Sequence, residues 1–95
     1  MKMVLESTLC IPKLDKTYKE MFVTECIEQS KLGYVKRYTE IPWKYDETNK
    51  RVIFRIHWNQ SNPYFAQNLE RLNSGENIKL VFGYPQMWHI YLAKN

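Results

Sequence analysis

The feature that most constrains the fold is a strict alternation of side chains over residues 51–58. The apolar residues at every second position are Val52, Phe54, Ile56 and Trp58. The residues between them are Ile53, Arg55 and His57. A period of two places alternate side chains on opposite faces of a β-strand. The segment therefore predicts a strand with one face against a core and the other face open.

Shorter patterns along the chain predict four more strands and two helices. The strands are expected over residues 7–14, 34–43, 78–82 and 88–92, and the helices over 17–31 and from Asn62–Pro63 to Asn73. The order β-α-β-β-α-β-β predicts an α+β, ferredoxin-like fold, in which two helices lie on one face of an antiparallel sheet. The last two strands form a C-terminal hairpin that adds one strand. A chain of 95 residues is expected to form a single domain, 1–95.

Capping and turn residues set the expected boundaries. Thr17 and Glu20 have the spacing of a capping box at the start of the first helix. Gly33 is expected to end that helix. The polar residues Lys44–Lys50 predict a turn before the alternating strand, and Gly83–Gln86 predicts a hairpin turn.

Two of the strands are expected to be irregular. Val35, Tyr38 and Ile41 alternate imperfectly with polar residues, which predicts a bulge or an edge position. Pro12 has no amide hydrogen to donate, so the first strand should end or lose a partner there.

Composition narrows the class of protein. Apolar residues make up 44% of the chain, which excludes a disordered tail, and no apolar run approaches the ~18–20 residues of a membrane span. The first residues lack the apolar stretch of a signal peptide, and two cysteines are too few for a disulfide scaffold, so an intracellular location is expected. Aromatic residues make up 15%, and we expect them mainly in the core. The expected core is Leu9, Ile11, Phe22, Cys26, Val35, Val52, Phe54, Ile56, Phe65, Leu69, Leu72, Ile90 and Leu92.

The chain resembles the RNA recognition motif (RRM) family over about residues 7–94. Leu9–Leu14 stands where the family has its first-strand motif and matches it at three positions, the two aliphatic ones and the final leucine. Arg51–Trp58 stands where the family has its octapeptide and matches it at Arg51, Ile56 and Trp58. Leu32–Val35 is similar to the family's step from helix to strand. Leu72–Gly75, followed by residues 90–94, is similar to its second-helix exit and last strand.

More loosely, the chain resembles small RRM-like proteins of large DNA viruses, through its Tyr84–Trp88 segment. That resemblance implies a host-cell location, cytoplasmic or nuclear. The RRM resemblance implies binding of single-stranded RNA by bases that stack on sheet aromatics. Cys10, Ile53 and Arg55 stand at the stacking positions, so the aromatic rings are missing. The resemblance therefore supports the fold more than it supports RNA binding.

A basic cluster is the main candidate for contact with nucleic acid. Residues 36–55 contain six cationic and three acidic side chains, a local net charge of +3 in a chain of net charge +4. A phosphate backbone that crosses the open sheet face would pass these cations. The candidate binding residues are Lys36, Arg37, Lys50, Arg51, Arg55, His57 and Tyr91.

A protein partner, or a second copy of the chain, is the alternative for the same face. Apolar and aromatic side chains among the basic ones would suit such a contact. The candidate residues are Cys10, Ile53, Tyr84 and Tyr91.

Metal binding and catalysis are not expected. The two cysteines and two histidines lack the spacing of a zinc site. Cys10 and His57 are expected on one face, but no third group is evident to orient them, and glycine-rich phosphate loops are absent. We therefore expect a binding module without a cofactor and not an enzyme.

Overall fold

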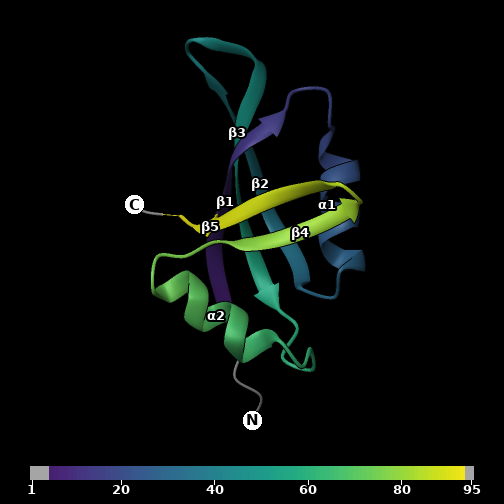
Figure 1. Ribbon diagram of the computed structural model, residues 1–95, viewed down its shortest axis with the longest axis vertical. Coiled ribbons are helices and arrows are strands. Elements are labelled where there is room, and N and C mark those ends of the chain that lie inside the picture. Colours follow the sequence, from purple (N-terminus) through teal and green to yellow (C-terminus); the bar gives the residue numbers. More distant parts are fainter. Residues whose placement is uncertain (1–4, 94–95) are drawn as a thin grey trace.

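A computed structural model describes residues 5–93, and the outer ends of the predicted domain, residues 1–4 and 94–95, lie outside the described part. Five strands and two helices follow one another in the predicted order (Figure 1). The strands are β1 (Glu6–Asp15), β2 (Gly33–Trp43), β3 (Asp46–Trp58), β4 (Ile78–Gly83) and β5 (Gln86–Leu92). The helices are α1 (Glu20–Gln29) and α2 (Phe65–Asn73). The predicted α+β class is confirmed.

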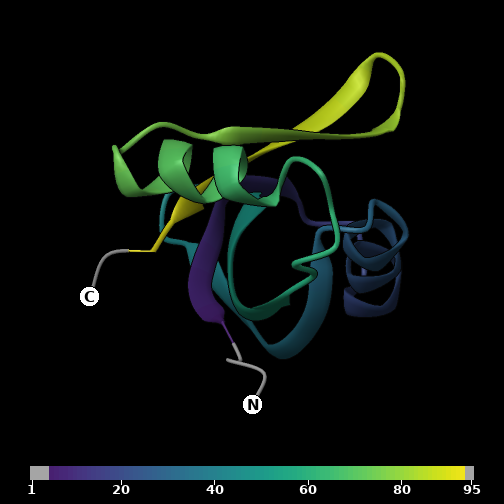
Figure 2. The same ribbon diagram turned by 90° about the horizontal axis from the view of Figure 1, so that it is seen from below.

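The five strands form one antiparallel sheet in the order β2-β3-β1-β5-β4. The number and the order of strands differ from those of an RRM, because β4 is inserted between α2 and the strand that pairs with β1. The first half keeps the split βαβ arrangement, since β1 and β2 run parallel with β3 between them. In the second half β4 runs antiparallel to β3, so α2 does not connect two parallel strands. Instead, α2 lies with the β4–β5 hairpin on one side of the other three strands (Figure 2).

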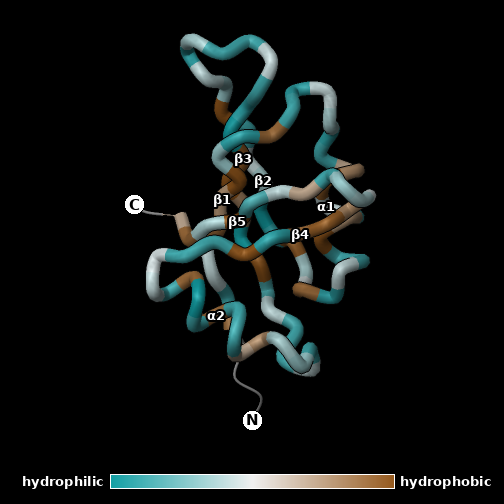
Figure 3. Tube along the Cα trace, viewed as in Figure 1, coloured by the Kyte–Doolittle hydropathy of each residue, from teal (hydrophilic) through white to brown (hydrophobic). Residues whose placement is uncertain are grey.

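The core forms where the inward faces of the sheet meet both helices. Leu9 pairs with Phe54 and Ile11 with Val52 across β1 and β3, and these four side chains are fully or almost fully buried. Hydrophobic segments gather where β1 and β3 pass behind the β4–β5 hairpin (Figure 3). The other buried members of this core are Leu14, Val23, Ile27, Leu32, Ile56, Trp58, Leu72, Ile78, Leu80, Trp88 and Ile90.

The predicted core is partly wrong in α1. It is confirmed for seven members that are buried: Leu9, Ile11, Val52, Phe54, Ile56, Leu72 and Ile90. Phe22 is 41% exposed, whereas Val23 and Ile27 are fully buried, so the inward face of α1 is turned by one residue from the expected one. Phe22 instead stacks on Tyr18 at the margin of the core, with ring centroids 5.2 Å apart. The remaining members predicted for the core pack against its edge and are partly buried: Cys26, Val35, Phe65, Leu69 and Leu92.

Several boundaries differ from the predicted ones for local reasons. Helix α1 begins after Lys19 without a side-chain cap, because the Thr17 hydroxyl donates to the Asp15 carboxylate instead, at 2.6 Å. The left-handed residue after α1 is Lys31, with φ 66°, and Gly33 is the first residue of β2. A Cβ atom at Gly33 would collide with the backbone carbonyl of the paired strand, so this glycine serves close strand approach.

The β2–β3 hairpin is longer and its turn tighter than predicted. Asp46 already pairs with Trp43, so most of the expected turn belongs to β3. The expected irregularities are confirmed: β2 is an edge strand with a register shift between Val35 and Arg37, and β1 has a shift around Pro12 but continues to Asp15.

Candidate nucleic-acid interface

One face of the sheet points away from the core, and we call it the open face. Its outward residues on β1, β2, β3 and the end of β5 include Glu6, Thr8, Cys10, Tyr34, Lys36, Arg37, Thr39, Ile41, Arg51, Ile53, Arg55, His57 and Tyr91. Both helices direct their buried residues into the core on the opposite side. Alternation along β3 placed Ile53, Arg55 and His57 on this face correctly.

Glu6 is the one carboxylate among these outward residues, and it organises the end of the face where β3 finishes. Its carboxylate lies 2.8 Å from Arg55 Nε, 2.9 Å from Lys36 Nζ and 3.8 Å from His57 Nδ1. Hydrogen bonds from Arg55 and Lys36 lower the pKa of Glu6 to about 2. Arg55 also donates to the Thr8 hydroxyl at 3.2 Å. The cluster is therefore ordered, and two of the predicted phosphate-binding cations are held by a carboxylate.

Arg37 and Arg51 lie on the same face without a carboxylate partner among residues 5–93. Arg37 is exposed and pairs across the ladder with Arg55, so two guanidinium groups project from neighbouring strands. Arg51 lies near the Cys10 thiol, whose pKa is raised by burial while Arg51 acts in the opposite direction. Of the predicted cations, these two arginines are the ones that no carboxylate within residues 5–93 holds.

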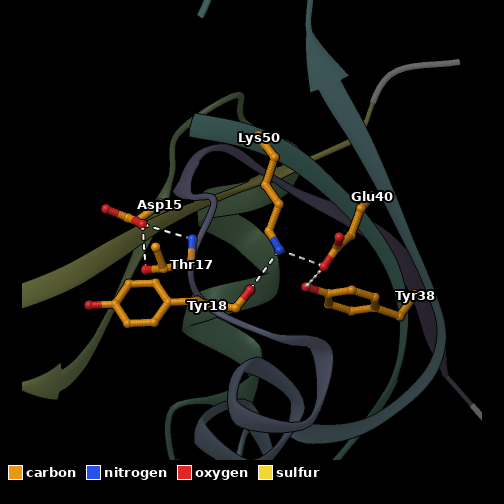
Figure 4. A network of polar contacts seen from close by, with 6 residues as sticks. All are labelled: Asp15, Thr17, Tyr18, Tyr38, Glu40 and Lys50. Atoms are coloured by element: carbon orange, nitrogen blue, oxygen red, sulfur yellow. Dashed lines mark hydrogen bonds and ion pairs between the residues drawn. The ribbon is translucent and has the colours of Figure 1, made fainter. Parts of the chain in front are cut away.

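Lys50 does not belong to the open face, contrary to its place among the predicted binding residues. Only 6% of Lys50 is exposed, and its ammonium donates to the Tyr18 carbonyl at 2.6 Å and to the Glu40 carboxylate at 2.7 Å (Figure 4). The Tyr38 hydroxyl donates to the same Glu40 oxygen at 3.1 Å, and burial raises the pKa of Tyr38. Lys50 precedes Val52 by two positions, so the alternation that defined β3 already places it on the core side.

The residues predicted for a protein partner fall into two places. Cys10 pairs with Ile53 on one side and Tyr91 on the other, which makes a short apolar strip across the middle of the open face. Cys10 itself is 6% exposed, beneath its half-buried neighbours. Tyr84 is exposed at the tip of the β4–β5 hairpin and is not part of the strip.

Exposed aromatic residues at the two ends of β2 were not among the predicted site residues. Tyr34 is 70% exposed beside His57, its partner in the ladder. Trp43 is 42% exposed and Tyr45 is 91% exposed at the β2–β3 turn. The bulge near Val35 breaks the alternation of side chains along β2. Counting every second residue from Tyr34 therefore assigns the residues after the bulge to the wrong face of the sheet. A second register shift separates Pro42 from Trp43, so alternation along β2 does not predict the position of Trp43.

The cysteines and the histidine considered for catalysis or metal binding lie apart in the described part of the chain. Cys10 pairs with Ile53 whereas His57 pairs with Glu6, so the two potential reactive groups lie at different levels of the sheet. Cys10 and Cys26 are free thiols on different elements. Within residues 5–93 no three His, Cys, Asp or Glu side chains gather in a way that could hold a metal ion. No helix in this range is long and apolar enough to cross a membrane.

Comparisons of the chain with models of protein families, with curated proteins and with solved structures found no match. A function for this chain must therefore be argued from the geometry and charge of the open face.

Proposed function

We propose that this protein is a non-enzymatic, RRM-like binding module that contacts single-stranded nucleic acid, RNA in the first place, through the open face. One observation supports this most strongly. The outward residues of the face include Lys36, Arg37, Arg51 and Arg55 against a single carboxylate, that of Glu6. Cations arranged along a groove or sheet attract a phosphate backbone irrespective of base sequence.

The positions of these cations suit a single strand of nucleic acid that crosses β2 and β3 on the open face. The pair formed by Arg37 and Arg55 provides two guanidinium groups side by side, which can bind phosphate oxygens or stack on bases. Tyr34 adds an exposed ring at the same end of β2. Because Cys10 is covered by its neighbours, a base cannot stack at that position as it does in the RRM family. Contact with bases would instead involve the guanidinium groups, Tyr34 and the Tyr91 ring.

The test is binding of a fluorescently labelled oligouridine of about ten nucleotides, within the usual range of site sizes, measured by anisotropy at about 50 mM salt. The double variant Arg37→Ala/Arg51→Ala is expected to weaken binding and to reduce its salt dependence. The matched control, Lys19→Ala/Arg71→Ala, removes two cations beside the helices, where Lys19 precedes α1 and Arg71 lies in α2. Equal loss in both variants would mean that net charge, and not this face, causes binding.

A protein partner or a homodimer is the second candidate, and the strip formed by Cys10, Ile53 and Tyr91 favours it. An apolar strip with a charged margin resembles a small interface with a polar rim. Ile53→Asp would then dissociate a dimer or complex, which sedimentation would detect. A protein that is monomeric at all accessible concentrations would exclude the homodimer.

A further inference from the structure

The β2–β3 hairpin extends beyond the rest of the fold at the top of Figure 1. A groove lies between the turn of this hairpin and Pro12–Lys13 of β1. The groove has a volume of about 580 Å³, within the range of ~300–1,000 Å³ that small ligands occupy. Its lining residues are Pro12, Lys13, Trp43, Lys44, Tyr45 and Asp46. Trp43, Lys44 and Tyr45 at the turn of this hairpin are exposed and lie outside the core.

The Trp43 indole is held in place by a hydrogen bond at its edge. Its Nε1–H donates to the Pro12 carbonyl at 2.8 Å. That carbonyl lies where the β1–β3 register shifts between Ile11 and Leu14, and the strand irregularity thus provides the acceptor. The indole N–H lies in the plane of the ring, so the bond fixes the ring without using its π-faces. Since 42% of Trp43 remains exposed, an ordered aromatic surface faces solvent.

The charges around the groove favour an anion that has an aromatic part. Lys13 and Lys44 line the groove, and the Lys44 ammonium lies 5.4 Å from the centre of the Tyr45 ring. The acidic member, Asp46, directs both carboxylate oxygens into its own turn, where they accept hydrogen bonds from Thr48 and Asn49. Those bonds lower the pKa of Asp46 to about 2. The groove therefore combines a flat apolar surface with two exposed ammonium groups.

We propose that this groove binds one nucleobase of a single strand, stacked on the Trp43 indole, with the adjoining phosphates near Lys13 and Lys44. A nucleotide is the occupant that matches both the aromatic surface and the flanking positive charge. The inference rests on the proposed function, because the nucleic-acid strand that crosses the open face would continue past Arg51 to the β2–β3 hairpin. It adds a site for a base that the missing aromatic residues on β1 and β3 do not provide.

The experiment compares two probes: an oligouridine of about ten nucleotides, and an abasic ribose-phosphate chain of the same length. Trp43→Leu is expected to weaken binding of the oligouridine by about 5-fold to about 150-fold, the range for loss of one stacked base. Its affinity for the abasic chain should be unchanged. The matched control, Tyr84→Leu, removes an exposed ring at the tip of the other hairpin and should bind both probes as the original protein does.

Tryptophan fluorescence provides a second readout that needs no variant. Trp58 and Trp88 are 2% and 4% exposed, so quenching by a stacked base would come from Trp43. Quenching by the oligouridine but not by the abasic chain is the expected result. The base site is refuted if Trp43→Leu binds the oligouridine as tightly as the original protein while Arg37→Ala/Arg51→Ala still weakens it, and the proposed function then stands. Quenching by a decaproline peptide and not by the oligouridine would assign the groove to a protein partner and overturn the inference. Failure of every oligonucleotide to bind would refute the function and the base site together.

Discussion

Replacing Glu6 with glutamine should strengthen nucleic-acid binding, although the substitution adds no cation. Glu6 holds Arg55 at 2.8 Å and Lys36 at 2.9 Å, and its negative charge lies where a phosphate would approach. Glutamine has the same shape and no charge, so Glu6→Gln leaves both cations free to pair with phosphates. A loss of affinity would be expected if the carboxylate served only to order the binding surface.

The size of the effect depends on the number of cations that are released. Each phosphate neutralised on a single strand contributes about 0.7 to the slope of log K against log salt. If both Lys36 and Arg55 then pair with phosphates, the slope should steepen by up to about 1.4. The gain in affinity should be largest at low salt and should disappear as salt is raised, because the new contacts are electrostatic.

Anisotropy titrations of the labelled oligouridine over a series of salt concentrations measure this slope. The control is Glu76→Gln, which makes the same change of charge at an exposed carboxylate that lies 3.7 Å from Arg71, beyond α2. If Glu6→Gln and Glu76→Gln have the same slope, Lys36 and Arg55 do not bind phosphate, and the reasoning about the open face is wrong.

Four further outcomes test the account of the fold. The pKa of Glu6 is lowered from an ordinary 4.5 to about 2. Its ion pairs should therefore stabilise the native state above about pH 4.5, and this stabilisation should be lost as pH falls towards 2. Acid unfolding of Glu6→Gln should consequently be less steep over this range than that of the original protein. Lys50→Met should lower the free energy of unfolding by about 1.5–3 kcal/mol, measured in urea, and leave oligouridine binding unchanged, whereas weaker binding would return Lys50 to the interface. Ile56→Val should lower the free energy of unfolding in urea by about 0.5–1.5 kcal/mol. Val81→Ala, at a half-exposed position, should lower it by less than about 0.5 kcal/mol. Equal losses would contradict the assigned core. Gly33→Ala should cost about 1–3 kcal/mol, since its Cβ meets the partner strand, and a neutral effect on thermal unfolding would refute that close approach.

Alternation in β3 was the part of the fold that the sequence predicted best. A strand with one buried face has side chains of period two, and Val52, Phe54 and Ile56 are all buried as that period requires. The same rule, extended back to Lys50, gives the correct inward direction. Lys50 was nevertheless predicted to bind nucleic acid at the surface, because a lysine is rarely buried unless it has partners such as the Tyr18 carbonyl.

Helix α1 and the second half of the sheet were harder to predict because tertiary contacts decide them. A rotation of one residue separates the Phe22 face of α1 from the Val23 face, and both are apolar. The choice depends on the β4–β5 hairpin, whose Phe82 and Trp88 rings lie 6.0 and 6.1 Å from Phe22. The strand that pairs with β1 is likewise set by how this hairpin packs, which local periodicity does not encode.

The candidate site was predictable where its residues follow strand parity and not where the strand is irregular. Arg55 and His57 were placed on the open face by alternation alone. Trp43 was not, because the bulge in β2 shifts the parity and because its acceptor, the Pro12 carbonyl, belongs to a strand 31 residues away in sequence. A contact between residues so far apart in the chain leaves no periodic pattern in the sequence.

The central claim is that the open face binds single-stranded nucleic acid. Its most direct test is the anisotropy of a labelled oligouridine titrated with the protein at about 50 mM salt, repeated with Arg37→Ala/Arg51→Ala. The account predicts saturable binding that weakens linearly on a log-log salt plot and is reduced by the double variant more than by the control pair beside the helices. No binding at about 50 mM salt, where electrostatic affinity is high, would contradict it.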